Sequence, residues 1–178
     1  MKHNIKSFSA ALLFILFTSK AFATGAGIQL GAVPGILINQ ESAKLENFTG
    51  SLTGNMKFSK IPVVVGAGFE SGKLNSDFNF GLSAFADYWF LELQLINTWS
   101  FYSGFGASGK LLTSDFKDWN FAAGARFFAG MNYLFWDGYL ELYAQQTIVP
   151  TYICNLKKVY SGSFMLCLPI EAGIRMHF

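Results

Sequence analysis

The stretch FTGSLTGNMKF, residues 48–58, decides the fold. Apolar or small residues occupy every second position from Phe48 to Phe58, and polar residues from Thr49 to Lys57 occupy the positions between them. Because strand side chains alternate between two faces while helix side chains repeat every 3.6 residues, this pattern predicts a strand with one apolar and one polar face. At about 3.3 Å per residue and a tilt of about 40°, such a strand matches the apolar layer of an outer membrane.

Seven further segments show the same alternation. They are residues 26–37, 62–71, 77–90, 98–108, 119–132, 138–150 and 163–178. The connectors 59–61, 91–97 and 133–137 are the shorter ones, although 91–97 also alternates and could extend either neighbouring strand. The connectors 38–47, 72–76, 109–118 and 151–162 are mostly longer and hold most of the remaining charges, including Lys110. Short inner turns and longer outer loops predict an all-β fold, an eight-stranded antiparallel up-and-down transmembrane β-barrel with both termini on the inner side.

The composition excludes most other classes of protein. Hydrophobic residues make up 52% of the chain and charged residues only 13%, against about 25% in typical soluble domains. Beyond the N-terminal segment, no continuous apolar run reaches the roughly 18 residues of a membrane-spanning helix. Twenty Phe and 18 Gly with only four Pro suit strands and tight turns. A closed barrel remains as the way to place such a backbone in a bilayer with its hydrogen bonds satisfied.

The first residues predict export. Lys2 and Lys6 precede the apolar run 8–17, and the small-residue site Ala21-Phe22-Ala23 follows, so residues 1–23 are interpreted as a secretory signal peptide and residues 24–178 as the barrel. An uncleaved N-terminal anchor is the alternative. Three of the 13 basic residues lie in this segment, which leaves ten against 11 acidic residues and a net charge near −1. Nothing in that balance indicates a nucleic-acid partner.

Aromatic residues are expected to form belts at the two ends of the barrel. Those near the inner turns are Tyr88, Trp89, Trp99, Phe101, Tyr133, Phe135, Trp136 and Tyr139. Those near the outer ends are Phe48, Phe69, Phe78, Phe116, Trp119, Tyr152, Tyr160 and Phe164.

The last segment, LPIEAGIRMHF at residues 168–178, resembles the C-terminal β-signal of outer-membrane barrels, an alternating strand closed by a terminal Phe. This resemblance implies that Ile174, Met176 and Phe178 form the face read by the barrel-insertion machinery. Over residues 24–178 the chain is similar to the small eight-stranded barrels of the OmpA, OmpX and OmpW type. The stretches GFGASG, AAGARFFAGMNY and PIEAGIRMHF look most like a spirochaetal set of these proteins.

Charged residues fall on the inward register of the predicted strands. They are Lys57, Glu70, Asp87, Arg126, Glu141, Glu171, Arg175 and His177. An eight-stranded barrel is only wide enough for side chains to fill it, so buried ions there must pair. A static network that plugs the lumen and a gated polar pathway are both consistent with this, and barrel width favours the first. Arg126 is predicted to bridge Glu141 across the 133–137 hairpin, and Arg175 to be shared between Glu171 and a neighbouring strand.

Cys154 and Cys167 are the only cysteines. A hairpin centred near Tyr160–Ser161 would place them opposite each other, which predicts one disulfide across the last outer loop, and two unrelated thiols are the equal alternative. Beyond the signal, His177 is the one histidine and no Ser lies in a nucleophile motif, so we expect no enzyme, no metal site and no cofactor.

Three functions remain open at this point. The first is an integral outer-membrane barrel with a filled lumen and a structural or surface-interaction role in the envelope of a diderm bacterium, reached after Sec export. Its expected partners are outer-membrane lipids, the barrel-insertion machinery and an extracellular ligand of the loops. The second is a narrow pore for small or hydrophobic solutes, as OmpW-like relatives suggest. The third is a soluble exported barrel that binds a lipid inside.

Overall fold

A computed structural model describes residues 23–39, 42–58, 61–74, 77–155 and 162–178, with only the backbone described at 23–24, 37–39, 42–47, 74, 77, 155 and 162. The strands are β1 (Ala23–Asn39), β2 (Ser42–Phe58), β3 (Val63–Leu74), β4 (Asp77–Ile96), β5 (Trp99–Thr113), β6 (Asn120–Phe135), β7 (Leu140–Asn155), β8 (Gly162–Cys167) and β9 (Ile170–His177). One 3₁₀ turn, η1 (Trp136–Gly138), joins β6 to β7. Within these ranges no helix has the length and apolarity needed to cross a membrane.

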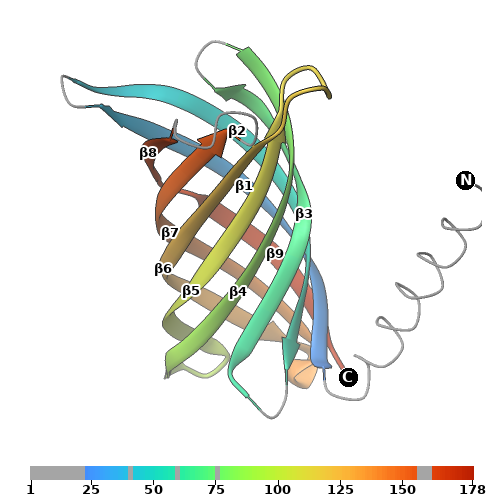
Figure 1. Ribbon diagram of the computed structural model, residues 1–178. Coiled ribbons are helices and arrows are strands. Elements are labelled where there is room, and N and C mark those ends of the chain that lie inside the picture. The colour runs from blue at the N-terminus through green and yellow to red at the C-terminus, as the bar shows by residue number, and fades with distance from the viewer. Residues whose placement is uncertain (1–22, 40–41, 59–60, 75–76, 156–161) are drawn as a thin grey trace, which may run out of the picture.

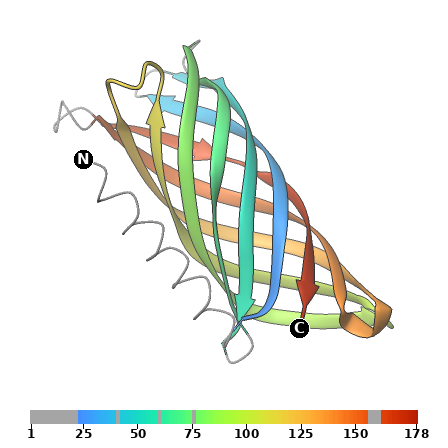
Figure 2. The same ribbon diagram turned by 90° about the vertical axis from the view of Figure 1, so that its right-hand side faces the viewer.

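The strands form one closed antiparallel ring (Figures 1 and 2). Each strand from β1 to β7 pairs with the next along the chain, and β8 and β9 both lie between β7 and β1. These two segments are therefore halves of one interrupted last strand. With β8 and β9 counted as one, the ring has eight strands. The predicted eight-stranded antiparallel β-barrel is confirmed. We call the end where β1 begins and β9 ends the terminal end, and the opposite end the loop end.

Several strands continue through segments that the sequence analysis assigned to connectors. β4 runs through residues 91–97 as far as Ile96, with register shifts after Trp89 and Gln94. β5 runs to Thr113, so the first half of the predicted connector 109–118 is strand. β3 and β7 likewise extend to Leu74 and Asn155. The extension of β4 confirms the expectation that residues 91–97 could continue a neighbouring strand. The predicted connectors 72–76, 109–118 and 151–162 were too long, because pairing with the neighbouring strands persists beyond the clear alternation.

The two faces of the strands separate as the alternation predicts. Large apolar side chains point outward and stay exposed, among them Leu30, Leu52, Phe69, Leu82, Phe127 and Ile170. The polar side chains of the opposite register are buried, among them Gln29, Thr53, Asn55, Asn132, Gln145 and Thr147. Trp89 is the exception to the predicted aromatic belts, because its side chain is only 5% exposed and lies inside the ring. Tyr160 lies outside the described residues.

The last strand of the ring is interrupted between β8 and β9 at Leu168 and Pro169, where proline lacks a backbone N–H donor. The carboxamide of Gln146, on the outward face of β7, donates to the carbonyl oxygens of Leu168 at 3.2 Å and Pro169 at 3.0 Å. Backbone bonds hold the remaining groups, from Leu168 N–H to the oxygen of Pro34 and from Thr147 N–H to the oxygen of Pro169, both at 2.8 Å. The wall is thus hydrogen-bonded through its break.

Candidate functional site in the barrel lumen

Polar side chains from strands that are not neighbours meet inside the ring. Arg126 on β6 reaches Asp87 on β4 and Glu171 on β9, while Asn55 on β2 reaches Tyr143 on β7. Contacts between non-adjacent strands require that these side chains cross the interior of the barrel. The lumen is therefore the place where the chain collects its buried charges.

The middle of the lumen is organised by Arg126. Its Nε donates to Asp87 Oδ1 at 2.9 Å, and its Nη2 donates to Glu171 Oε2 at 3.0 Å. The same Glu171 oxygen accepts from Gln145 Nε2 at 2.6 Å and from Thr147 Oγ1 at 3.0 Å. One guanidinium thus compensates two buried carboxylates, and neutral donors complete the coordination of the second. This arrangement meets the condition under which buried ions are tolerated.

Toward the terminal end a second group of side chains surrounds Glu141. Arg175 Nη1 approaches Glu141 Oε2 at 2.7 Å, and His177 Nε2 lies 2.8 Å from the same oxygen. Asn132 Nδ2 donates to the other carboxylate oxygen at 2.7 Å. Arg175 Nε also donates to Asn55 Oδ1 at 3.0 Å, so the guanidinium joins β9 to β2 and β7.

Aromatic rings fill the space between these two ionic groups. Trp89 stacks on Tyr102 with ring centroids 4.0 Å apart and planes 1° from parallel. The guanidinium of Arg175 lies 4.6 Å from the centre of the Tyr143 ring, and the ammonium of Lys57 lies 4.1 Å from that of Trp89. Cations placed over ring faces gain from the ring quadrupole, so the aromatic side chains contribute to holding the charges as well as excluding water.

Glycines opposite these rings provide the space that they occupy. Gly173 pairs in register with Tyr143, and a Cβ at position 173 would lie 2.5 Å from the Tyr143 hydroxyl. Gly130 pairs with Tyr102, and a Cβ there would lie 2.6 Å from that hydroxyl. In both pairs a large aromatic side chain lies opposite a glycine, which has no side chain, and this leaves room for the ring inside a narrow barrel.

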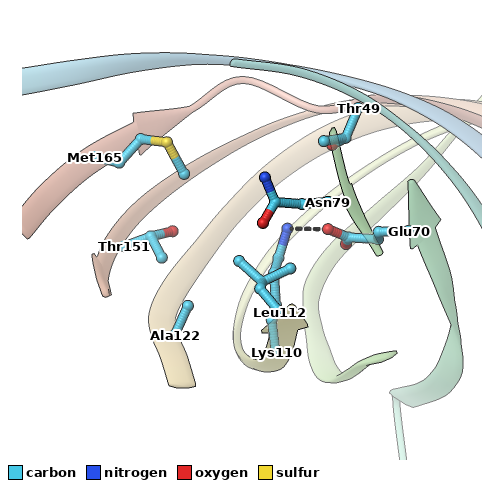
Figure 3. Close-up of a pocket in the computed structure, with 8 residues that line it drawn as sticks. All are labelled: Thr49, Glu70, Asn79, Lys110, Leu112, Ala122, Thr151 and Met165. Atoms are coloured by element: carbon cyan, nitrogen blue, oxygen red, sulfur yellow. Dashed lines mark hydrogen bonds and ion pairs between the residues drawn. The ribbon is translucent and has the colours of Figure 1, made fainter. Parts of the chain in front are cut away.

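The loop-end part of the lumen is different in chemistry. Lys110 Nζ lies 2.8 Å from Glu70 Oε2 (Figure 3). This pair borders a cavity of about 20 Å³, which is about the size of one water molecule. The cavity is lined by Thr49, Glu70, Asn79, Lys110, Leu112, Ala122, Thr151 and Met165, and Thr49 Oγ1 has no hydrogen-bond partner in this part of the described chain. Beside it, Val33, Val149, Met165 and Cys167 form an apolar cluster.

No disulfide joins Cys154 and Cys167 in the described part of the chain. In the β7–β8 ladder, Cys154 pairs with Gly162 and Cys167 pairs with Val149. The register therefore centres this hairpin nearer the chain start than Tyr160–Ser161, which separates the two cysteines along the strands. The buried Cys167 accepts a weak hydrogen bond from Thr151 Oγ1 at 3.9 Å. The disulfide hypothesis was wrong because it assumed the wrong register.

Of the eight predicted lumen residues, the structure brings Glu70, Asp87, Arg126, Glu141, Glu171 and Arg175 into ion pairs of 3.0 Å or less and places His177 2.8 Å from Glu141, but not all with the expected partners. Arg126 pairs with Asp87 and Glu171 instead of Glu141, and Arg175 pairs with Glu141. The prediction for Arg126 was wrong because it considered a hairpin neighbour, whereas this side chain reaches across the ring to β4 and β9. For Arg175 the expected partner on a neighbouring strand is present, since Glu141 lies directly opposite it on β7, but no ion pair with Glu171 accompanies it in the described residues. Lys57 lies at the terminal-end rim, 3.8 Å from Glu92.

Lys110 was not predicted as a lumen residue because residues 109–118 were interpreted as a connector. Its position could have been found from register, since it lies two residues beyond Ser108 on the inward face of β5. Neutral participants such as Asn55, Gln145 and Asn132 were also missed as site residues, although they occupy the same inward positions.

The residues of the predicted C-terminal signal lie on the outward face of β9 and just beyond it. Met176 and Phe178 are exposed, and Ile174 is partly buried. Across the described ranges, no three or more His, Cys, Asp and Glu side chains are grouped so that they could hold a metal ion.

The loop-end segment between β5 and β6 has a defined shape. Thr113 Oγ1 accepts from the backbone N–H of Phe116 at 2.9 Å. Asp115 Oδ1 accepts from the backbone N–H groups of Lys117 and Asp118, both at 2.9 Å. These N–H donors stabilise the ionised carboxylate and hold the pKa of Asp115 below its usual value, the bond from Asp118 having the largest effect.

Comparison with protein families and with curated proteins finds no match. Among solved structures, the chain is similar to Neisserial surface protein A, with 15% identity, a TM-score of 0.58, and coverage of 86% of this chain and 97% of that one. It also matches the attachment invasion locus protein Ail of Yersinia pestis, with 12% identity, coverage of 86% and 99%, and a TM-score of 0.45. The N-terminal β-barrel domain of Pseudomonas aeruginosa OprF matches with 14% identity, coverage of 83% and 96%, and a TM-score of 0.42.

The likeness of the fold is carried by the first of these structures, whose TM-score exceeds 0.5. Coverage of nearly the whole of both chains shows that the similarity extends over the complete ring. The fold is that of the small eight-stranded outer-membrane β-barrels.

Proposed function

We propose that the protein is an integral outer-membrane β-barrel whose side chains close its lumen, and that it serves the cell envelope as a structural or surface-interaction protein. The observation that carries this proposal is the separation of the two faces, with large apolar side chains exposed outward and charged ones buried in pairs inside. An apolar outer surface of this size is unfavourable in water and favourable in a bilayer. The closed ring leaves no unpaired backbone edge, so its backbone is also stable in lipid.

The packing of the lumen supports a barrel that does not conduct. Arg126 and Arg175 cross the ring at two levels, and the stacked rings of Trp89 and Tyr102 lie next to the second. To pass these levels, a solute would have to separate buried ion pairs, at a cost of several kcal/mol for each charge left alone. This favours the filled barrel over the narrow pore.

The soluble lipid-binding barrel is disfavoured by the direction of the side chains. Such a carrier needs an apolar interior and a charged exterior, whereas this chain buries Glu141, Arg175 and Asp87 and exposes rings such as those of Phe69 and Phe127. The export signal at residues 1–23 and an insertion signal at Ile174, Met176 and Phe178 belong to the same proposal.

The test is the electrophoretic mobility of the folded barrel. The chain from residue 24 onward is folded in detergent and run with and without boiling, and we expect faster migration of the unboiled sample. In planar bilayers the same preparation is expected to give no steady conductance. Solubility without detergent together with unchanged mobility would refute the membrane barrel, whereas a heat shift accompanied by ion conductance would refute only the closed lumen.

A further inference from the structure

The small loop-end cavity lies across the interior of the barrel. Every strand from β2 to β8 contributes at least one side chain to its lining. In Figure 3 the side chains of Thr49, Asn79 and Glu70 lie on one side of it, and those of Met165 and Ala122 lie on the other. Its volume of about 20 Å³ exceeds the roughly 10–15 Å³ that one water molecule requires, and it leaves no room for a larger ligand.

One polar atom at this cavity lacks a partner within the protein. Thr49 is 6% exposed, and among the residues that the structure describes no group forms a hydrogen bond with its Oγ1. The other threonine of the lining differs, because the Thr151 hydroxyl donates to the carbonyl oxygen of Val149 at 3.1 Å. Buried hydroxyl groups in folded proteins are nearly always satisfied by the protein or by ordered water. We therefore expect the hydroxyl of Thr49 to have a partner from outside the chain.

The groups around the cavity determine which ligand fits. The ammonium of Lys110 disfavours a cation, and the carboxylate of Glu70 disfavours an anion. A hard metal ion would also need about six oxygen ligands, and the described ranges hold no cluster of His, Cys, Asp and Glu suited to a metal. An apolar ligand would leave the hydroxyl of Thr49 unsatisfied. The ligand that fits is neutral, has the size of one water molecule, and both donates and accepts hydrogen bonds.

We propose that this cavity binds one water molecule as a fixed part of the lumen, with Thr49 Oγ1 as one of its hydrogen-bond partners. Asn79 and Glu70 bring a carboxamide and a carboxylate to the same cavity, so the site supplies the two to four polar partners that a buried water needs. The water links β2 to the ion pair between β3 and β5. The inference goes beyond the proposed function, because it requires only the closed ring and no particular role in the envelope.

The substitution T49V tests the proposal by the sign of its effect on stability. Valine has the shape of threonine without the hydroxyl, so in a dry cavity the change would remove an unsatisfied polar group and raise the urea midpoint of unfolding. With a bound water the change removes a hydrogen bond instead, and we expect the midpoint to fall by about 0.5 M. The mature chain is unfolded in lipid vesicles, after the heat shift on gels has shown that the variant is folded.

The chain offers a matched control in Thr147, another buried threonine of the lumen. Its hydroxyl donates to Glu171 Oε2 at 3.0 Å, so T147V removes a hydrogen bond that the protein itself supplies. We expect T49V and T147V to lower the midpoint together, and T147V to lower it more because its acceptor is a carboxylate. A midpoint that T49V leaves unchanged or raises, while T147V lowers it, would overturn the water site.

A crystal structure of the detergent-solubilised mature chain gives an independent test that needs no variant. We expect an electron-density peak in the cavity, within about 3.2 Å of Thr49 Oγ1. No density at this place, in a map that resolves other water molecules inside the lumen, would overturn the proposal, and so would a peak with the anomalous signal or the coordination of an ion. If the closed ring itself were wrong, no heat shift would appear, so the two failures are distinguishable.

Discussion

The two halves of the lumen differ in how their buried charges are compensated. From the middle to the terminal end, charged groups are linked by neutral donors, as where Glu171 accepts from Arg126, Gln145 and Thr147. At the loop end one ion pair, Lys110 with Glu70, lies beside an apolar cluster. Charge is thus concentrated where several strands supply compensating groups. We therefore expect the two halves of the lumen to differ in how much stability a substitution costs.

The largest effect is expected from R126M. Removal of the guanidinium leaves Asp87 and Glu171 buried without their cation, and breaking such a pair costs about 3–5 kcal/mol. The measurement is urea-induced unfolding in lipid vesicles, followed by tryptophan fluorescence.

The matched control removes the carboxylate charges as well. The triple variant with R126M, D87N and E171Q has no uncompensated ion and keeps polar groups for Gln145 and Thr147, so it should recover more than half of the lost free energy of unfolding. Equal instability of the single and triple variants would show that packing, rather than charge, dominates this half.

A smaller effect is expected from G173A. The added Cβ would lie 2.5 Å from the Tyr143 ring and hydroxyl and 2.6 Å from the carbonyl oxygen of Ile28, which the backbone cannot relieve. Overpacking of this kind costs about 1–3 kcal/mol in unfolding experiments. G50A is the control, because the one contact near its Cβ is at 3.9 Å on the outward face, and it should leave stability unchanged within about 0.5 kcal/mol.

K110M should have less effect than either substitution. Loss of the Lys110 ammonium leaves Glu70 without its partner, which costs about 1–3 kcal/mol. We expect the lower part of that range because the Lys110 and Glu70 side chains, 12% and 9% exposed, are more exposed than those of Arg126 and Asp87, at 6% and 3%. In the background of E70Q the same change should be nearly neutral, since methionine joins Leu112 and Met165. A loss as large as that of R126M would remove the distinction between the two halves.

The smallest effect concerns Asp115, outside the ring. Its pKa is depressed by the N–H groups of Asp118 and Lys117, so the stabilisation of the loop is present above the ordinary pKa of about 3.9 and is lost as pH falls through the lower folded value. Carboxyl-carbon NMR shifts during a pH titration should show a midpoint below 3.9. A midpoint at or above that value would mean that the loop is open in solution, and D115N should abolish the titration.

The fold could be predicted from the sequence because alternation is a local property. The pattern at residues 48–58 needs no knowledge of other strands, and the inward position of Arg126 and Glu141 follows from the same parity. The pairing of Arg126 with Asp87 could not be predicted, since it depends on where β4 and β6 lie around the ring. The predictions of the strand ends and of the position of Cys167 were wrong for a related reason, because register is set by long-range pairing.

The ring is closed by its first and last strands. Gly25 pairs with His177 and Ala32 with Ile170, so these contacts join positions about as far apart as the chain allows. A chain interrupted before β8 would leave β7 and β1 with unpaired edges, the kind of surface that recruits other strands. Closure must also await the synthesis of its final residues, and contacts of such sequence separation form slowly. The barrel therefore remains prone to aggregation until β8 and β9 have paired with β7 and β1. Pairing of this segment is the folding step that closes the ring.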